Sequence, residues 1–358
     1  MNLSIYLTTN MFCFIIYECK CELFAFGGLM KKFKAIVCII LVALLLGGAI
    51  FSVVFFVGEE DKKRIVVSSF PIYDICREVL GSDDDIKLLQ DNGVDAHSYQ
   101  PTSKDILALS KAELFVFIGG ESDGWVDDIV SSANNENIST LCLIDCVDKL
   151  EEQYDNIIHG SHNHGHTHEH DEEHGDDCYD EHIWLSLKNM IKMTESILDE
   201  LIKIFPEDEV KLTNNAESYI NRLVELDIRY ASVCNNVTTT IVLADKFPLL
   251  YLAHDYDINF LAAYHGCSSD TKASVSIISK LIEKVNEEEL NYICVLENNN
   301  ISIANSVVND SGCRRGVEIL EFNSLQSITN KKLSSTNYLD VMENNLNVLR
   351  MALNNEDI

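Results

Sequence analysis

Basic residues are scarce in this chain. Its 358 residues contain 27 Lys and Arg against 57 Asp and Glu, which gives a formal net charge of -30 at pH 7 with neutral histidine. Such an excess of negative charge repels nucleic acid and anionic lipid and attracts cations. We therefore exclude a nucleic-acid partner and expect a cation as the natural ligand.

A spaced cysteine framework is also lacking. The twelve cysteines are scattered, and four of them lie in or before an apolar N-terminal region. Cys142 and Cys146 stand four residues apart, but no second cluster completes a zinc ribbon. We predict mostly buried, free thiols and no disulfide scaffold.

Charge is absent from residues 35–57, AIVCIILVALLLGGAIFSVVFFV, and KKFK stands directly before them. An uncharged run longer than the roughly 20 residues that cross a bilayer, with basic residues before it, predicts a membrane segment that starts inside. We expect residues 30–63 to anchor the protein, uncleaved, on the outer face of a bacterial cytoplasmic membrane. Residues 1–29 are interpreted as an over-extended start before Met30, with a second membrane segment as the rival.

The rest of the chain alternates short apolar runs with helix-period segments. This rhythm covers residues 64–205 and returns over residues 235–358, so we predict an α/β fold of two lobes, each with a mainly parallel sheet flanked by helices. Residues 206–234 have no internal Pro or Gly beyond Pro206, and acids lie in their first turn. They predict one long helix that joins the lobes and limits their motion.

Four candidate ligands lie where strands or loops end. His97 is expected on a loop outside the carboxyl end of a strand, where open α/β sheets bind ligands, although an exposed loop histidine is an equal alternative. His182 follows two acids, or else packs beside Trp184. Asp245 ends a strand and has a helix N-cap as its alternative. Glu297 also ends a strand and is the weakest of the four.

A histidine-rich segment interrupts the first lobe. HGSHNHGHTHEHDEEHGDD spans residues 159–177, within a loop that we place at residues 151–180. Its glycines and dense polarity predict disorder, so the ions that it holds should be weakly bound and exchangeable. These secondary ligands are His159, His162, His164, His166, His168, His170 and His174.

Several motifs occur in one order along the chain: VSSFPIYDICREVLG, GVDAHSYQPTSKDILALSKAELFVFIGG, DEHIWLSLKN, NNAESYINRLVELD and NYLDVMENNLNVL. Together they resemble the zinc/manganese class of ABC-transporter solute-binding proteins, and HSYQPT with EHIWL is the most specific pair. The resemblance implies two Rossmann-like lobes joined by a rigid helix, with one divalent ion in the cleft between them. It also implies an ABC permease and its ATPase as partners, and we expect a monomer.

The resemblance also implies the ligands. His97 matches the family's first histidine ligand and His182 its second, whereas Asp245 stands where a third histidine is common. Asn323 replaces the carboxylate of manganese-type members, so Glu297 or a water would complete the shell. Zinc binds more tightly than manganese at almost any N/O site, so we expect Zn²⁺, with Mn²⁺ as the alternative.

Two rival functions remain. In a zinc hydrolase, Glu181 would act as general base on a metal-bound water, but the paired histidines of H-E-x-x-H are lacking. In a surface adhesin or metal-storage protein, binding by the histidine-rich loop would be the whole function. We therefore expect a carrier rather than an enzyme, with the loop as an accessory.

Overall fold

The computed structural model describes residues 63–90, 98–151, 179–266, 273–312 and 316–354. His97, the histidine-rich segment and the predicted membrane anchor lie outside the described residues. Within the described ranges, no helix is both long and apolar enough to span a membrane.

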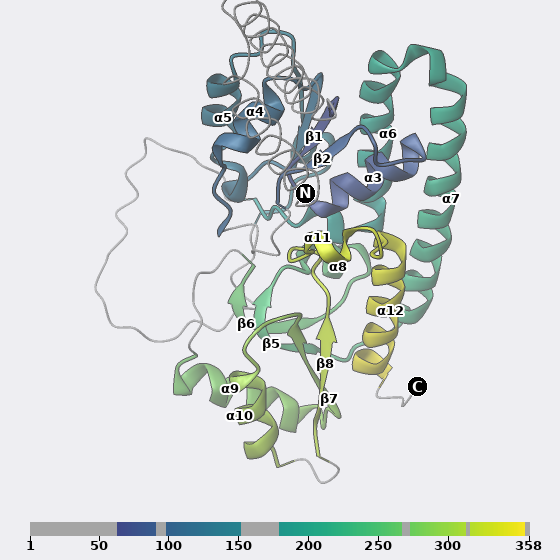
Figure 1. The fold of residues 1–358 in the computed structure, drawn as a ribbon. Helices are drawn as coiled ribbons and strands as arrows, with labels where there is room; N and C mark the ends of the chain where they lie inside the picture. The colour runs from purple at the N-terminus through teal and green to yellow at the C-terminus, as the bar shows by residue number, and fades with distance from the viewer. Residues whose placement is uncertain (1–62, 91–97, 152–178, 267–272, 313–315, 355–358) are drawn as a thin grey trace, which may run out of the picture. The chain divides into compact units, whose positions relative to one another are not determined.

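The N-terminal lobe contains a four-stranded parallel sheet in the order β2-β1-β3-β4 (Figure 1). Its helices begin and end at recognisable signals. In α3, Pro71 lies in the first turn and Gly81 closes the helix with a φ of 75°. Thr102 and Asp105 form a capping box at the start of α4. The elements are β1 (Ile65–Val67), α3 (Phe70–Leu80), β2 (Ile86–Leu88), α4 (Ser103–Leu109), β3 (Leu114–Phe117), α5 (Val126–Ala133) and β4 (Ser139–Cys142).

The C-terminal lobe repeats this plan with a parallel sheet in the order β6-β5-β7-β8. The predicted fold class, two parallel-sheet lobes flanked by helices, is thereby confirmed. The elements are β5 (Ile241–Phe247), α8 (Leu250–Asp255), β6 (Phe260–His265), α9 (Val275–Glu287), β7 (Tyr292–Leu296), α10 (Ser302–Asp310), β8 (Glu318–Phe322), α11 (Asn330–Leu333) and α12 (Tyr338–Asn354).

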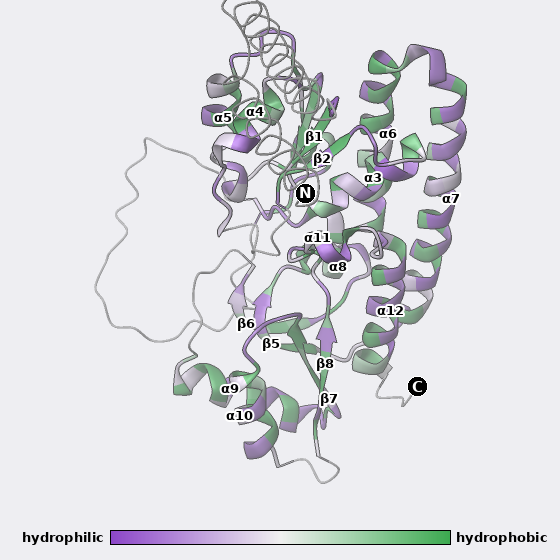
Figure 2. Ribbon diagram, viewed as in Figure 1, coloured by the Kyte–Doolittle hydropathy of each residue, from purple (hydrophilic) through white to green (hydrophobic). Residues whose placement is uncertain are grey.

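Both faces of each sheet are covered, as the apolar composition of the strands requires. Along β5, Ile241 and Leu243 belong to a large core shared with the long helices, whereas Val242 and Ala244 pack toward α9 and α10. The period-two alternation of a strand therefore feeds two different cores. Figure 2 shows hydrophobic residues along β1 and both colours along α7.

Two long helices connect the lobes. α6 (Leu187–Ile204) is followed by α7 (Glu209–Cys234), a helix of 26 residues that occupies most of the segment where the sequence predicts a joining helix. Asn215 of α7 donates to the carbonyl of Val79 at the end of α3, and Tyr230 of the same helix donates to the carbonyl of Met342 in α12. The helix therefore contacts elements of both lobes.

A buried polar seam also joins the lobes. The Arg77 guanidinium pairs with Asp74 and donates to the carbonyls of Leu333 and Thr336, while the backbone N–H of Tyr338 donates to Asp74 at 3.1 Å. Burial raises the pKa of Asp74 to about 6, although Arg77 opposes the shift. Asp74 thus accepts from its own helix and from the other lobe, and the two carbonyls accept from Arg77 across the lobes.

Candidate metal-binding site

His182 is the most tightly held of the predicted ligands. Its side chain is fully buried and lies edge-on to the Trp184 ring, with 5.3 Å between the ring centroids. The Asp180 carboxylate lies 3.1 Å from His182 Nδ1 and also accepts the backbone N–H of His182 at 2.8 Å. When Nδ1 donates its hydrogen to Asp180, Nε2 carries the lone pair that binds a metal.

The imidazole of His182 lies against the other lobe. A Cβ added to Gly266, directly after β6, would stand 2.9 Å from His182 Cε1 and 3.0 Å from the carbonyl oxygen of Phe247. Real Cβ atoms do not approach this closely, so only glycine fits here without displacement of the ring. The ring thus lies at the seam of the two lobes, at the end of strand β6.

Glu181 is committed to a structural contact in the N-terminal lobe. One of its carboxylate oxygens accepts the backbone N–H of Ser122 at 2.8 Å, and the other accepts the Ser122 hydroxyl. Gly120, at a φ of 99°, leaves room for this side chain, since a Cβ there would lie 2.8 Å from Glu181 Oε2. These contacts tie the segment before His182 to the loop after β3.

Asp245 lies in β5, and its carboxylate is bound by nearby donors. Its oxygens accept the backbone N–H of Lys246 at 2.8 Å, the backbone N–H of Leu296 at 3.2 Å and the side-chain amide of Asn299 at 3.0 Å. Burial raises the pKa of Asp245, and these hydrogen bonds oppose the shift. The carboxylate therefore links β5 to the end of β7.

Glu297 follows β7 and is held in a similar way. Its two oxygens accept the backbone N–H and the hydroxyl of Ser324, both at 2.7 Å. Burial raises the pKa of Glu297 above that of a solvated carboxyl. Its backbone N–H donates to the carbonyl of Phe322 in β8. This strand-end carboxylate thus fastens the loop that follows β8.

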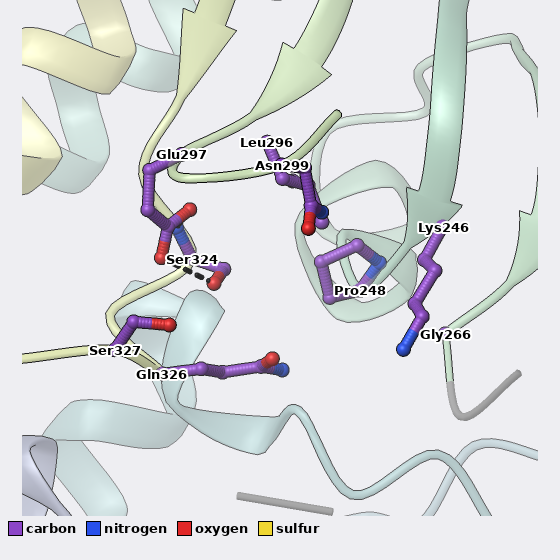
Figure 3. A pocket seen from close by; sticks show the side chains of 9 residues that line it. All are labelled: Lys246, Pro248, Gly266, Leu296, Glu297, Asn299, Ser324, Gln326 and Ser327. Atoms are coloured by element: carbon purple, nitrogen blue, oxygen red, sulfur yellow. Dashed lines mark hydrogen bonds between the residues drawn. The ribbon is translucent and has the colours of Figure 1, made fainter. Parts of the chain in front are cut away.

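A small cavity opens beside Glu297 (Figure 3). Its volume is about 20 Å³, which is enough for one water or one bare ion. Glu297 and Lys246 stand on opposite sides of it in Figure 3, and the Lys246 side chain extends toward Gly266. The cavity is lined by Lys246, Pro248, Gly266, Leu296, Glu297, Asn299, Ser324, Gln326 and Ser327, a set that does not include Asp245.

The strand register of β5 shifts next to Asp245 and Lys246, of which only Lys246 lines the cavity. Leu243 of β5 pairs with Ala262 of β6, and Lys246 pairs with Tyr264, so β5 advances three residues where β6 advances two. One extra residue in a strand breaks the alternation of side chains between the two faces. Strict alternation counted from the sequence therefore does not tell which of Asp245 and Lys246 faces the cleft.

Only part of the predicted ligand set lies among the described residues: His182, Asp245 and Glu297. Nowhere in the described part of the chain do three His, Cys, Asp or Glu side chains come together as a group that could hold a metal ion. His182 and the Glu297 cavity share Gly266 as a neighbour. Asp245 is not in the cavity lining, but its carboxylate accepts from Leu296 and Asn299, which are. His97 and the loop histidines lie outside the described residues, so their roles stay predictions.

Three residues that matter here were not singled out in the sequence. Asp180 orients His182, Ser324 anchors Glu297, and Lys246 lines the cavity. The acid two residues before His182 is a signal that sequence reasoning can use, because metal-ligating histidines commonly donate to a carboxylate. Ser324 and Lys246 carry no such signal, since their placement depends on tertiary structure.

Comparison with known proteins identifies the family. A family model, described as the periplasmic component A of the zinc-uptake complex, matches residues 65–352. The chain belongs to this family. Since the match runs from β1 to α12, both lobes and all the described candidate ligands lie inside the family region.

Relatives and solved structures agree with this membership. The zinc-binding protein AdcA of Streptococcus pyogenes serotype M3 is 27% identical over 302 residues, which are 82% of this chain and 56% of that protein. The zinc-binding lipoprotein AdcA of Streptococcus pneumoniae is 28% identical over 301 residues, 83% of this chain and 57% of that protein. The chain thus spans little more than half the length of these curated relatives.

The crystal structure of the Zn(II)-bound ZnuA-like domain of Streptococcus pneumoniae AdcA has the same fold. It matches with a TM-score of 0.63 and 26% identity, and the match covers 81% of this chain and 98% of that domain. The two-lobed unit described above therefore corresponds to one complete domain of this family.

Proposed function

We propose that this chain captures Zn²⁺ outside the cytoplasm and delivers it to an ABC permease with its ATPase. The membership in the zinc-uptake component family supports this function. The observation that carries it is the buried His182 imidazole, which Asp180 orients at the seam of the two lobes. Mn²⁺ is the alternative cargo, and it would bind such nitrogen ligands less tightly than Zn²⁺.

The proposed ligands are two imidazoles, His97 and His182, with carboxylates from Asp245 and Glu297. Two nitrogens with one or two carboxylate oxygens suit tetrahedral zinc. Asp245 and Glu297 would have to exchange present hydrogen bonds for the metal, because both accept backbone N–H groups in this structure. Such exchangeable oxygen ligands suit a carrier, which must release its ion to the permease.

The remaining parts of the chain are assigned accessory roles. We propose that residues 30–63 anchor the protein to the membrane and that it acts as a monomer. The seven histidines between His159 and His174 would hold additional ions weakly and raise their local concentration near the cleft. The zinc hydrolase has no support from the family.

A zinc competition titration with a fluorescent chelator tests the proposal. The wild type should bind one ion tightly and further ions weakly. The variant without residues 159–177 should keep the tight ion. His182→Ala should lose at least about 100-fold in affinity for it, because it removes the imidazole itself, and loss of a partner that only orients such a ring already costs about 10- to 100-fold. His97→Ala should behave similarly, and Asp245→Ala should be intermediate.

The matched control is His254→Ala, which removes an exposed histidine at the end of α8 and should leave the tight site unchanged. Loss of all binding in the loop deletion would make the histidine-rich segment the true site. An unchanged affinity in His182→Ala would exclude the proposed ligand set.

A further inference from the structure

The cavity beside Glu297 contains a basic residue where a cation carrier would be expected to present only acceptors. Its lining combines one carboxylate, from Glu297, with the side chain of Lys246 and several neutral polar groups. Figure 3 shows the Lys246 side chain directed along the cavity wall toward Gly266. Gly266 is also a neighbour of the His182 ring, since a Cβ added to it would stand 2.9 Å from His182 Cε1.

The backbone of β5 sets the direction in which the Lys246 side chain leaves the strand. Lys246 is paired in the β5–β6 ladder opposite Tyr264, just after the register shift, so its Cβ is directed by the strand. The preceding carboxylate of Asp245 accepts from Leu296 and Asn299 and is not itself part of the cavity lining. The C-terminal lobe therefore presents an ammonium group, together with Glu297, to the region that His182 approaches.

A lysine ammonium is a compact monovalent cation with three donors and no acceptor. It can neutralise a carboxylate such as Glu297 but cannot bind a metal while it is charged. A divalent ion close to it would meet its repulsion. The cavity, which has room for about one water-sized occupant, is bordered by the Lys246 side chain, so an ion that entered it would lie beside that positive charge.

We infer that Lys246 limits the affinity of this site for divalent cations by occupying its C-terminal side with a tethered positive charge. The ammonium group stays beside the bound ion and repels it, which weakens the binding and favours release. The inference rests on the proposed function and adds to it: Lys246 keeps the captured ion exchangeable and thereby favours its transfer.

The test is a zinc competition titration of the full chain, together with the rate at which a chelator removes the bound ion. Lys246→Met removes the charge and keeps the length of the side chain. We expect its affinity to rise about tenfold, the factor for one unit charge lying about 6 Å from a dication in water, with a slower release of zinc. The conservative variant Lys246→Arg should restore the lower affinity of the wild type.

Two further variants make the result decisive. Lys280→Met removes an exposed positive charge in α9 and should leave zinc binding unchanged. Lys246→Gln is a second neutral variant that replaces Lys246→Met if thermal unfolding shows that the latter does not fold. Equal or weaker zinc binding by the folded neutral variant, or equal tightening by Lys246→Arg, would overturn the inference.

The outcomes separate this inference from the proposed function. If the wild type binds no tight zinc, or His182→Ala binds as the wild type does, the proposed function fails. If the wild type binds zinc tightly, His182→Ala does not, and the neutral variants of Lys246 have the zinc affinity of the wild type, only the role of Lys246 is wrong.

Discussion

The two sides of the candidate site hold their polar groups in opposite ways. On the N-terminal side, the His182 ring is buried and its Nδ1 faces the Asp180 carboxylate, which fixes the ring for a ligand at Nε2. On the C-terminal side, the carboxylates of Asp245 and Glu297 already accept backbone N–H groups, and Lys246 extends along the cavity. One side is oriented for a metal, and the other is bound within its own lobe.

The difference has a physical consequence for binding. A ligand that is already oriented loses little freedom when the ion arrives, so its full bond strength contributes to affinity. A carboxylate that must first give up hydrogen bonds contributes only the difference between two sets of partners. We therefore expect the N-terminal side to determine most of the affinity and the C-terminal side to determine how readily the ion leaves.

The largest effect in this comparison should come from Asp180→Ala. Removal of the carboxylate frees the tautomer and the orientation of His182, and such outer-shell losses typically cost about 10- to 100-fold in metal affinity. A zinc competition titration measures the loss. Asp148→Ala is the matched control, because Asp148 is an exposed acid whose described partner is Lys192 on the surface of α6. An unchanged affinity in Asp180→Ala would show that the ring needs no orienting partner.

A smaller effect is expected from Gly266→Ala. The added methyl group would stand 2.9 Å from His182 Cε1, so the ring or the end of β6 must move. Overpacking of this kind costs about 1 kcal/mol or more, which corresponds to about a fivefold loss of zinc affinity if the ring is displaced. Gly312→Ala is the control, since a Cβ there meets its nearest neighbour, Asn286 Oδ1, at an ordinary 3.6 Å.

Isothermal titration and thermal unfolding of both glycine variants separate the two explanations for any loss. A lower melting temperature with unchanged zinc affinity would mean that β6 yields and that the His182 ring keeps its place. That outcome would contradict the close coupling of the ring to the C-terminal lobe.

The smallest effect should come from Glu297→Gln. The amide can still accept from Ser324, so the loop after β8 should stay in place, and the loss of an anchored carboxylate should reduce zinc affinity by no more than about fivefold. Glu321→Gln is the matched control, an exposed acid on the neighbouring strand β8. A loss above about 50-fold would make Glu297 a principal ligand and would reverse the comparison.

Much of the fold could be predicted from the sequence because its signals are local. Short apolar runs separated by helix-period segments indicated two α/β lobes, and both parallel sheets are present. The long helix was signalled by the absence of interior Gly and Pro, and α7 fills most of that segment. The start of α4 is of the same local kind, since Thr102 and Asp105 stand three residues apart and form a capping box.

The site could be predicted only in part because its chemistry depends on tertiary placement. His182 was found from its motif, and the orientation of its ring by Asp180 follows from a near neighbour in sequence. The exposure of Lys246 to the cavity depends on a register shift between two strands, which has no signature in composition or periodicity. The same holds for Glu297, whose partner Ser324 comes from a separate loop.

One zinc competition titration tests the central claim most directly, with Asp180→Ala and Glu297→Gln measured side by side against the wild type. We expect Asp180→Ala to lose at least several-fold more affinity than Glu297→Gln, because only the N-terminal side is oriented for the metal in advance. Equal losses, or a larger loss in Glu297→Gln, would contradict it.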